Sequence, residues 1–216
     1  MTDFAAQREN MVELQVRPNG VTDRRIIDAM AAVRREDFVP AQRSSVAYMD
    51  EDVPLGGGRY LIEAMAFAKL LQLAEIKPGD KVLIVGAGMG YGAAVAAQLA
   101  ARVVAVEQVP DLAAVAKRAL AGLANVLVIE GMLAEGARGQ GPYDAIIIEG
   151  RVADVPEGLI GQLAGAGRLV AVVGEQDVAK AQVLTTTGKT VSRKAAFDAS
   201  IAPLPGFARK VPAFVF

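Results

Sequence analysis

A glycine-rich segment is the part of the sequence best suited to hold a ligand. The apolar run Val82–Val85 leads directly into alternating glycines, and an alanine-rich stretch of helical character follows. Glycines permit a tight turn and a close approach of a ligand to the backbone, while the free N–H groups of a helix start bind polar or anionic atoms. The sequence therefore predicts a nucleotide site here, lined by Gly86, Ala87, Gly88 and Gly90.

A carboxylate lies where such a site needs one. Glu107 ends the next apolar run, about 20 residues after the glycines, and in this type of fold an acid there accepts hydrogen bonds from the ribose hydroxyls. Gln108 follows it. Glu149 ends a later apolar run, at the edge where ligands gather in open α/β sheets. A solvated acid at a strand end, or one that caps the next helix, remains the alternative for both carboxylates.

The composition limits the chemistry. The chain has no cysteine and no histidine, which excludes disulfides and thiolate sites and makes a catalytic transition metal improbable. Its net charge is −1, so charge gives no reason to expect nucleic acid or an anionic membrane as a partner. No apolar run reaches the ~18 residues of a membrane span, and the N-terminus lacks a secretory pattern. We expect a soluble, cytoplasmic protein.

From residue 81 onward, short aliphatic runs alternate with Ala- and Leu-rich stretches. Runs that are apolar almost throughout fit a mostly parallel sheet with helices on both faces. The expected strands are 81–85, 102–106, 126–129, 144–149 and 168–173, and the expected helices are 91–100, 112–123 and 155–163. Thr185–Thr190 is typical of a hairpin tip and Ala213–Phe216 of a terminal strand, which predicts an antiparallel edge.

The turn Lys77–Asp80 divides the chain. Before it we expect a helix over 3–16, a second from Thr22 or Asp23 to Val33, a long loop over 48–60 and a third helix over 61–74. We interpret residues 1–76 as an N-terminal helical extension with a substrate-side loop, and residues 77–216 as a Rossmann-like core, the two forming one compact unit.

These features together resemble the protein-L-isoaspartate O-methyltransferase family. The stretches that carry the resemblance are Met30–Pro40, Tyr48–Leu55, Ile76–Leu83, Gly86–Tyr91, Tyr143–Asp144 and Gly165–Val170. The resemblance implies a seven-stranded methyltransferase sheet, S-adenosylmethionine as the methyl donor, and transfer to the carboxylate of isoaspartyl residues in damaged proteins or peptides, or to a small carboxylate acceptor. It also implies donor-binding roles for Gly131, Met132 and Leu133, next to those of the glycine turn, Glu107, Gln108 and Glu149.

The chain departs from the family at positions that contact the ligands. The family sequence G-Q-T-I-S-Q-P is matched by Gly58–Ala64, so Tyr60 stands where the family has threonine and Ile62 where it has serine. Ile84 replaces a carboxylate two residues before the first glycine of the turn, and Met132 replaces the aspartate that faces the adenine amino group. An apolar Met132 can pack on adenine without accepting its hydrogen bond.

Two residues are candidates to replace the missing hydroxyls. The Tyr60 phenol would hydrogen-bond a substrate, and Arg59 would attract a carboxylate as a forked pair. Packing for Tyr60 and a solvated surface charge for Arg59 are the alternatives.

Three functions remain open from the sequence. The first is the O-methyltransferase. The second is a catalytically inactive family member that acts as a nucleotide-binding or protein-interaction module. The third is a nicotinamide oxidoreductase, which the spacing of the glycines and the lack of a Tyr-x-x-x-Lys pair disfavour.

Overall fold

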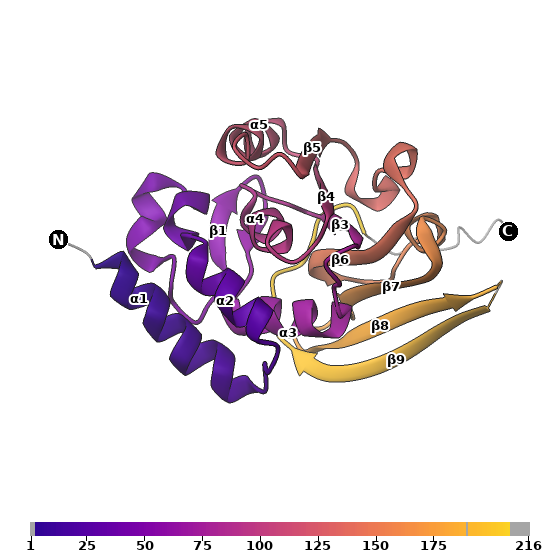
Figure 1. Cartoon of the computed structure of the whole chain (residues 1–216), viewed down its shortest axis with the longest axis horizontal. Coiled ribbons are helices and arrows are strands. Elements are labelled where there is room, and N and C mark those ends of the chain that lie inside the picture. The colour runs from indigo at the N-terminus through magenta and orange to yellow at the C-terminus, as the bar shows by residue number, and fades with distance from the viewer. Residues whose placement is uncertain (1–2, 189, 208–216) are drawn as a thin grey trace, which may run out of the picture.

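A twisted seven-stranded sheet forms the centre of the computed structural model, which describes residues 3–188 and 190–207 (Figure 1). Its strand order is β5-β4-β3-β6-β7-β8-β9. The strands are β3 (Lys81–Val85), β4 (Arg102–Glu107), β5 (Val126–Glu130), β6 (Tyr143–Val152), β7 (Leu163–Val173), β8 (Ala179–Thr187) and β9 (Thr190–Ala199). The first five in chain order are parallel, whereas β8 pairs antiparallel with both β7 and β9. The predicted parallel sheet with an antiparallel edge is confirmed.

The central strand β3 explains why these runs are apolar throughout. All of its residues from Val82 to Val85 are fully buried. Val82 and Ile84 join the core cluster that includes the N-terminal helices, while Leu83 and Val85 join the cluster on the opposite face. Successive side chains of a strand point to opposite faces, so a sheet covered on both sides needs apolar residues at every position.

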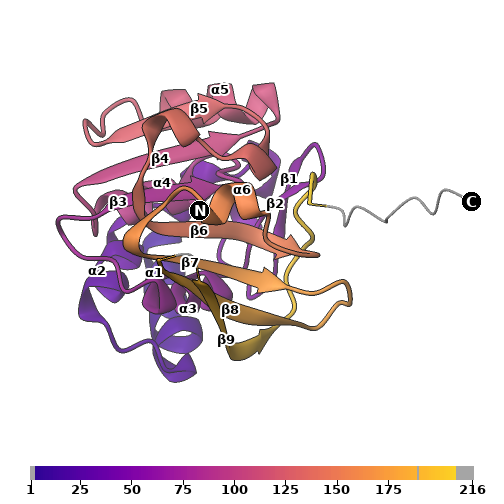
Figure 2. The same cartoon turned by 90° about the vertical axis from the view of Figure 1, so that its right-hand side faces the viewer.

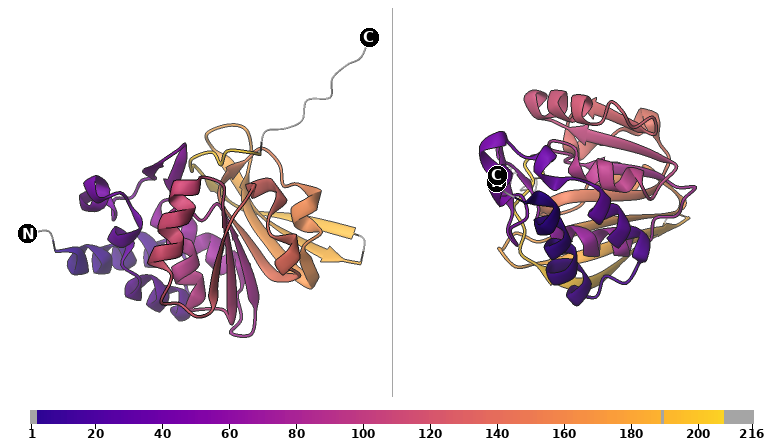
Figure 3. Two further views of the ribbon diagram at one scale, coloured as in Figure 1. Left: turned by 90° about the horizontal axis from the view of Figure 1, so that it is seen from above. Right: turned by 60° about the vertical axis from the view of Figure 1, so that its left-hand side comes forward.

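The helices are α1 (Phe4–Met11), α2 (Arg24–Ala32), α3 (Ala64–Ala74), α4 (Tyr91–Ala97), α5 (Pro110–Ala119) and α6 (Glu157–Ile160). A π-helical turn, Val12–Val16, extends α1, and 3-10 turns lie at Arg17–Asn19, Arg35–Phe38, Ala41–Val46, Leu133–Glu135 and Arg138–Gln140. Figure 3 shows the N-terminal helices gathered on one side and the β8–β9 hairpin at the other end. In the described part of the chain no helix has the length and apolar character that crossing a membrane requires.

The structure corrects three of the predicted elements. The segment 48–60 is not all loop, because an antiparallel hairpin forms there from β1 (Val53–Gly56) and β2 (Arg59–Leu61). Leu61 pairs with Val53 in this hairpin, so α3 begins three residues later than predicted. The expected helix 155–163 is a single turn, because β7 already begins at Leu163. The terminal strand predicted at 213–216 lies outside the described residues.

After β9 the chain returns across the carboxyl edge of the sheet, as a segment that we call the crossing segment (residues 200–207). It is fixed to β6 by two backbone hydrogen bonds, from Arg151 N to Ala202 O (2.9 Å) and from Leu204 N to Arg151 O (2.7 Å). Figure 2 shows it running beside the β1–β2 hairpin. Two segments far apart in sequence therefore meet over one edge of the sheet.

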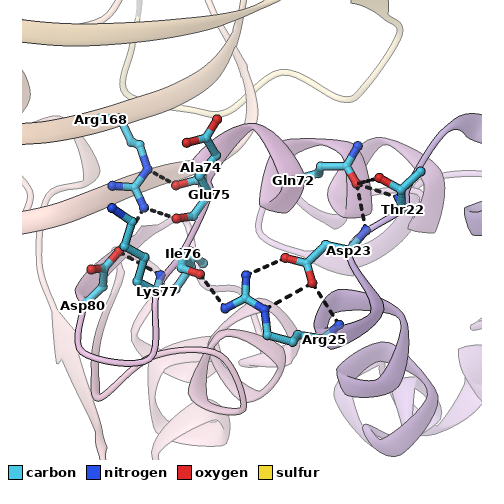
Figure 4. Close-up of polar contacts among 10 residues, drawn as sticks. All are labelled: Thr22, Asp23, Arg25, Gln72, Ala74, Glu75, Ile76, Lys77, Asp80 and Arg168. Carbon is cyan, nitrogen blue, oxygen red and sulfur yellow. Dashed lines mark hydrogen bonds and ion pairs between the residues drawn. The ribbon is translucent and has the colours of Figure 1, made fainter.

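Polar side chains join the N-terminal helices to the sheet (Figure 4). Arg168 of β7 donates to the carbonyl oxygens of Ala74 and Glu75 at the end of α3, and it pairs with Asp80 at 2.9 Å. Arg25 of α2 donates to Ile76 O at 3.0 Å. Carbonyl groups at a helix end lack partners within the helix, so Arg168 satisfies groups that would otherwise be orphaned, while Arg25 binds the carbonyl just beyond the helix end.

We expect Arg168→Ala to lower the free energy of unfolding by about 2–3 kcal/mol, since it removes charged hydrogen bonds to partly buried acceptors. Urea unfolding followed by circular dichroism measures the change. Arg118→Ala is the control, because Arg118 is exposed on α5 and should matter by less than about 0.5 kcal/mol. Equal decreases in the free energy of unfolding for the two variants would contradict the role of Arg168 in holding the end of α3 against the sheet.

Candidate donor-nucleoside site

The glycine turn joins β3 to α4 as the sequence predicts. Gly86, Gly88 and Gly90 have φ angles of 87°, 56° and 107°, a region that other residues rarely adopt. The amides of Gly86 and Ala87 donate to Val106 O at 2.9 and 3.0 Å, which bends the turn toward β4. The turn thus lies between the ends of β3 and β4, next to the point where the strand order reverses.

Glu107 lies at the centre of the site and is fully buried at the end of β4. Its Oε1 accepts the backbone amides of Gln108 (2.9 Å) and Val109 (3.0 Å). Its Oε2 accepts the amide of Gly88 (2.7 Å) and Nε of Arg59 (3.2 Å). A carboxylate has about four lone-pair sites, so the protein itself uses the full acceptor capacity of Glu107.

Arg59 is 2% exposed, so the alternative of a solvated surface charge is wrong. Besides its ion pair with Glu107, it donates from Nη2 to Gly86 O at 2.6 Å. The sequence pattern did not indicate that Arg59 would pair with Glu107, which lies 48 residues further along the chain. A carboxylate acceptor would have to compete with Glu107 for the guanidinium. Tyr60, next to it on β2, is half-buried, and its substrate role stays a prediction.

Three side chains occupy the space over the glycine turn. A methyl group built on Gly86 would lie 2.6 Å from Arg59 Nη2 and 2.9 Å from Leu204 Cδ1, and one on Gly88 would lie 2.6 Å from Leu55 Cδ1. Backbone approach to such glycines is what a bound nucleotide needs. In this conformation the residues present therefore do not fit a nucleoside at the turn, although the turn and Glu107 have the chemistry to hold one.

The sequence analysis missed Leu55 and Leu204, which are both buried. The only signal for them was an apolar residue within a Gly- or Pro-rich stretch. Sequence pattern gave no indication that the two would lie over the same turn, because Leu55 belongs to the β1–β2 hairpin and Leu204 to the crossing segment.

The remaining predicted donor residues line the same edge of the sheet. Gly131 follows β5 and donates its amide to Glu107 O at 3.0 Å. Leu133 is buried, whereas Met132 is 56% exposed and is free to pack on a flat ring. Gln108 is half-buried beside Gly206 of the crossing segment. Contacts of these residues with adenine stay predictions.

Glu149 is buried beneath α4, with an exposure of 5%, and its Oε1 has no hydrogen-bond partner among the described residues. Burial raises the pKa of its carboxyl to about 8, against the opposing effect of the Arg59 and Arg35 charges. Gly92 allows this placement, because a side chain there would collide with Glu149. At neutral pH Glu149 is therefore mostly protonated and adds little negative charge beside Glu107.

Arg35 is a further buried residue that the sequence analysis did not single out. It donates from Nε to Ala47 O (2.7 Å) and from Nη2 to Ile62 O (2.6 Å), and its guanidinium lies 4.9 Å from the Tyr91 ring centroid. Since Ile62 joins β2 to α3, Arg35 fixes the base of the β1–β2 hairpin against the rest of the molecule.

A parallel sheet with a glycine turn at its switch point and an acid at the next strand end defines a Rossmann-like nucleotide-binding fold of the methyltransferase type. The profile of the protein-L-isoaspartate(D-aspartate) O-methyltransferase (PCMT) family matches residues 6–203. The chain belongs to this family.

Relatives and solved structures agree with this assignment. The protein-L-isoaspartate O-methyltransferase of Koribacter versatilis is 38% identical over 208 residues, covering 95% of this chain and 94% of that protein. That of Methanoculleus marisnigri is 40% identical over 173 residues, covering 79% of each chain. A solved protein-L-isoaspartate O-methyltransferase superposes with a TM-score of 0.79 at 24% identity, covering 93% of this chain and 67% of its own. A putative enzyme from Plasmodium falciparum, solved with S-adenosyl-L-homocysteine, gives 0.77 at 20% identity, covering 95% of this chain and all of its own. At these identities the two structures show the shared fold.

Glu149→Gln should change how stability depends on pH. The folded protein keeps a proton on Glu149 that the unfolded chain releases above its ordinary pKa of 4.5, so wild-type stability falls as pH rises. The fall is about 1.4 kcal/mol per pH unit and ends near the folded-state pKa of about 8. Glutamine cannot ionise, and the variant should therefore gain a few kcal/mol relative to wild type between pH 5 and pH 8.

Urea unfolding at several pH values measures this difference. Glu175→Gln serves as the control for the substitution itself, since Glu175 is exposed and its replacement should change the free energy of unfolding by less than about 0.5 kcal/mol. A Glu149→Gln curve parallel to that of wild type would show that Glu149 is ionised in the folded protein.

Proposed function

We propose that this protein transfers a methyl group from S-adenosylmethionine to the free carboxylate of an isoaspartyl residue in a protein or peptide. The observation that carries the proposal is the family match along nearly the whole chain, together with a glycine turn whose Gly88 amide binds the strand-end Glu107. Similarity at this level to proteins named as O-methyltransferases supports methyl transfer over the alternative of an inactive interaction module.

The chemistry suits a chain without histidine. A sulfonium donor is already activated, and a carboxylate acceptor is ionised near neutral pH, so no general base is needed. The protein then has to hold the acceptor in line and exclude water, which positioning residues can do. The half-buried Tyr60 lies on β2, at the hairpin that borders the donor site, and we propose it as a group that orients the acceptor.

Transfer from tritium-labelled S-adenosylmethionine to a peptide containing one isoaspartyl residue tests the proposal. The control is the same peptide with normal aspartate, and we expect label in the isoaspartyl peptide only, released as methanol by mild base because a methyl ester forms. Equal labelling of both peptides, or of neither, would contradict it. Labelling of small carboxylic acids alone would assign a small-molecule acceptor instead.

A further inference from the structure

We propose that Arg59 takes the place of the donor's ribose at Glu107, so that the nucleoside site of this chain stays closed until the β1–β2 hairpin withdraws. The inference rests on the proposed function for the identity of the ligand, an S-adenosyl compound. It concerns binding, and is therefore separable from the transfer reaction.

The hydrogen bonds of Glu107 provide the first argument. Two backbone amides occupy Oε1, and Oε2 is shared by the Gly88 amide and Arg59 Nε. The backbone donors belong to the turn and to the strand end, so they remain when a ligand binds. Arg59 is the one side chain in the set. Ribose hydroxyls can reach Glu107 as hydrogen-bond donors only where Arg59 now donates.

The packing over the turn gives the second argument. Leu55 and Arg59 belong to the hairpin and Leu204 to the crossing segment, and all three are buried against the glycines. Arg59 also donates a hydrogen bond to the carbonyl oxygen of Gly86. A ligand that approached the turn backbone would displace all three side chains, so the closure is steric as well as electrostatic. Withdrawal of the hairpin moves Leu55 and Arg59, whereas Leu204 has to rotate its side chain because its backbone is held on β6.

The third argument concerns which part can move. The base of the hairpin is tied by Asp52, which accepts the amides of Glu63 (2.8 Å) and Ala202, and by Arg35 at Ile62 O. The tip is the glycine run 56–58, with φ angles of 99°, 59° and 72°. A methyl group built on Gly57 would lie 3.2 Å from Val109 and one built on Gly58 would lie 3.7 Å from Pro205, so the neighbours of the tip are apolar side chains. Breaking the Arg59 pair therefore frees the tip to pivot on a fixed base.

This arrangement predicts that loss of Arg59 strengthens ligand binding. Apparent affinity is reduced by the fraction of molecules in the open state. A minor open state of about one molecule in ten is typical of two-state proteins, and removing the closure should then tighten binding about tenfold. Arg59→Gln keeps polarity near Glu107 while removing the forked cation.

Isothermal titration calorimetry with S-adenosylhomocysteine on the full chain provides the test. We expect the dissociation constant of Arg59→Gln to be about tenfold lower than that of wild type. Arg43→Gln is the matched control, since Arg43 is exposed in a 3-10 turn away from the glycines, and it should bind as wild type does. Leu204→Ala retains the ion pair and should tighten binding severalfold; it decides the matter if Arg59→Gln does not fold, as judged by circular dichroism.

Unchanged or weaker binding in the folded Arg59 and Leu204 variants would overturn the inference. Absence of binding in wild type and in both variants would overturn it too, because a site closed by these side chains has to open when they are removed. Failure of the proposed function looks different: the variants would bind S-adenosylhomocysteine more tightly, yet no methyl group would reach the isoaspartyl peptide.

Discussion

Burial of one carboxylate organises this edge of the molecule. Glu107 is removed from water, and a buried charge is tolerated only when its hydrogen bonds are satisfied and its charge is opposed. The amides of Gly88, Gln108 and Val109 satisfy three of its bonds, and Arg59 supplies both the fourth bond and the opposing charge. The glycine turn, the end of β4 and the β1–β2 hairpin are thus fixed relative to one another by a single side chain.

Two separate constraints then require glycine at positions 86 and 88. The positive φ angles of the turn favour glycine, and so does the close packing of Arg59, Leu55 and Leu204 on its surface. In a nucleotide-binding turn the missing side chains make room for a ligand. Here the same room is taken by the protein's own side chains, so a glycine pattern reports space beside the backbone without reporting what fills it.

The central sheet was predictable because each buried strand is marked by the apolar residues of its own short segment. The runs in β3, β4 and β6 are apolar throughout, which buried parallel strands require, and the structure places them within one or a few residues of the predicted bounds. The β1–β2 hairpin was missed because its strands are only four and three residues long, too short to show a strand period, and the segment around them is rich in acidic residues, proline and glycine. The burial of Arg59 was missed for another reason. Its partner Glu107 lies 48 residues away, and the local sequence around an arginine does not show which distant acid it will pair with.

The buried Glu107 has an opposing charge without a ligand, because Arg59 pairs with it in the closed conformation. Arg59 opposes Glu107, while Glu149 avoids a second buried negative charge by holding its proton, since its pKa lies near 8. Ile84 is fully buried in the apolar core and adds no charge. Withdrawal of Arg59 would leave Glu107 with three amide donors and one unfilled acceptor position, so the open state is costly unless a ligand hydroxyl donates there. Closure and ligand binding are therefore alternative ways to supply the fourth hydrogen bond of the buried Glu107.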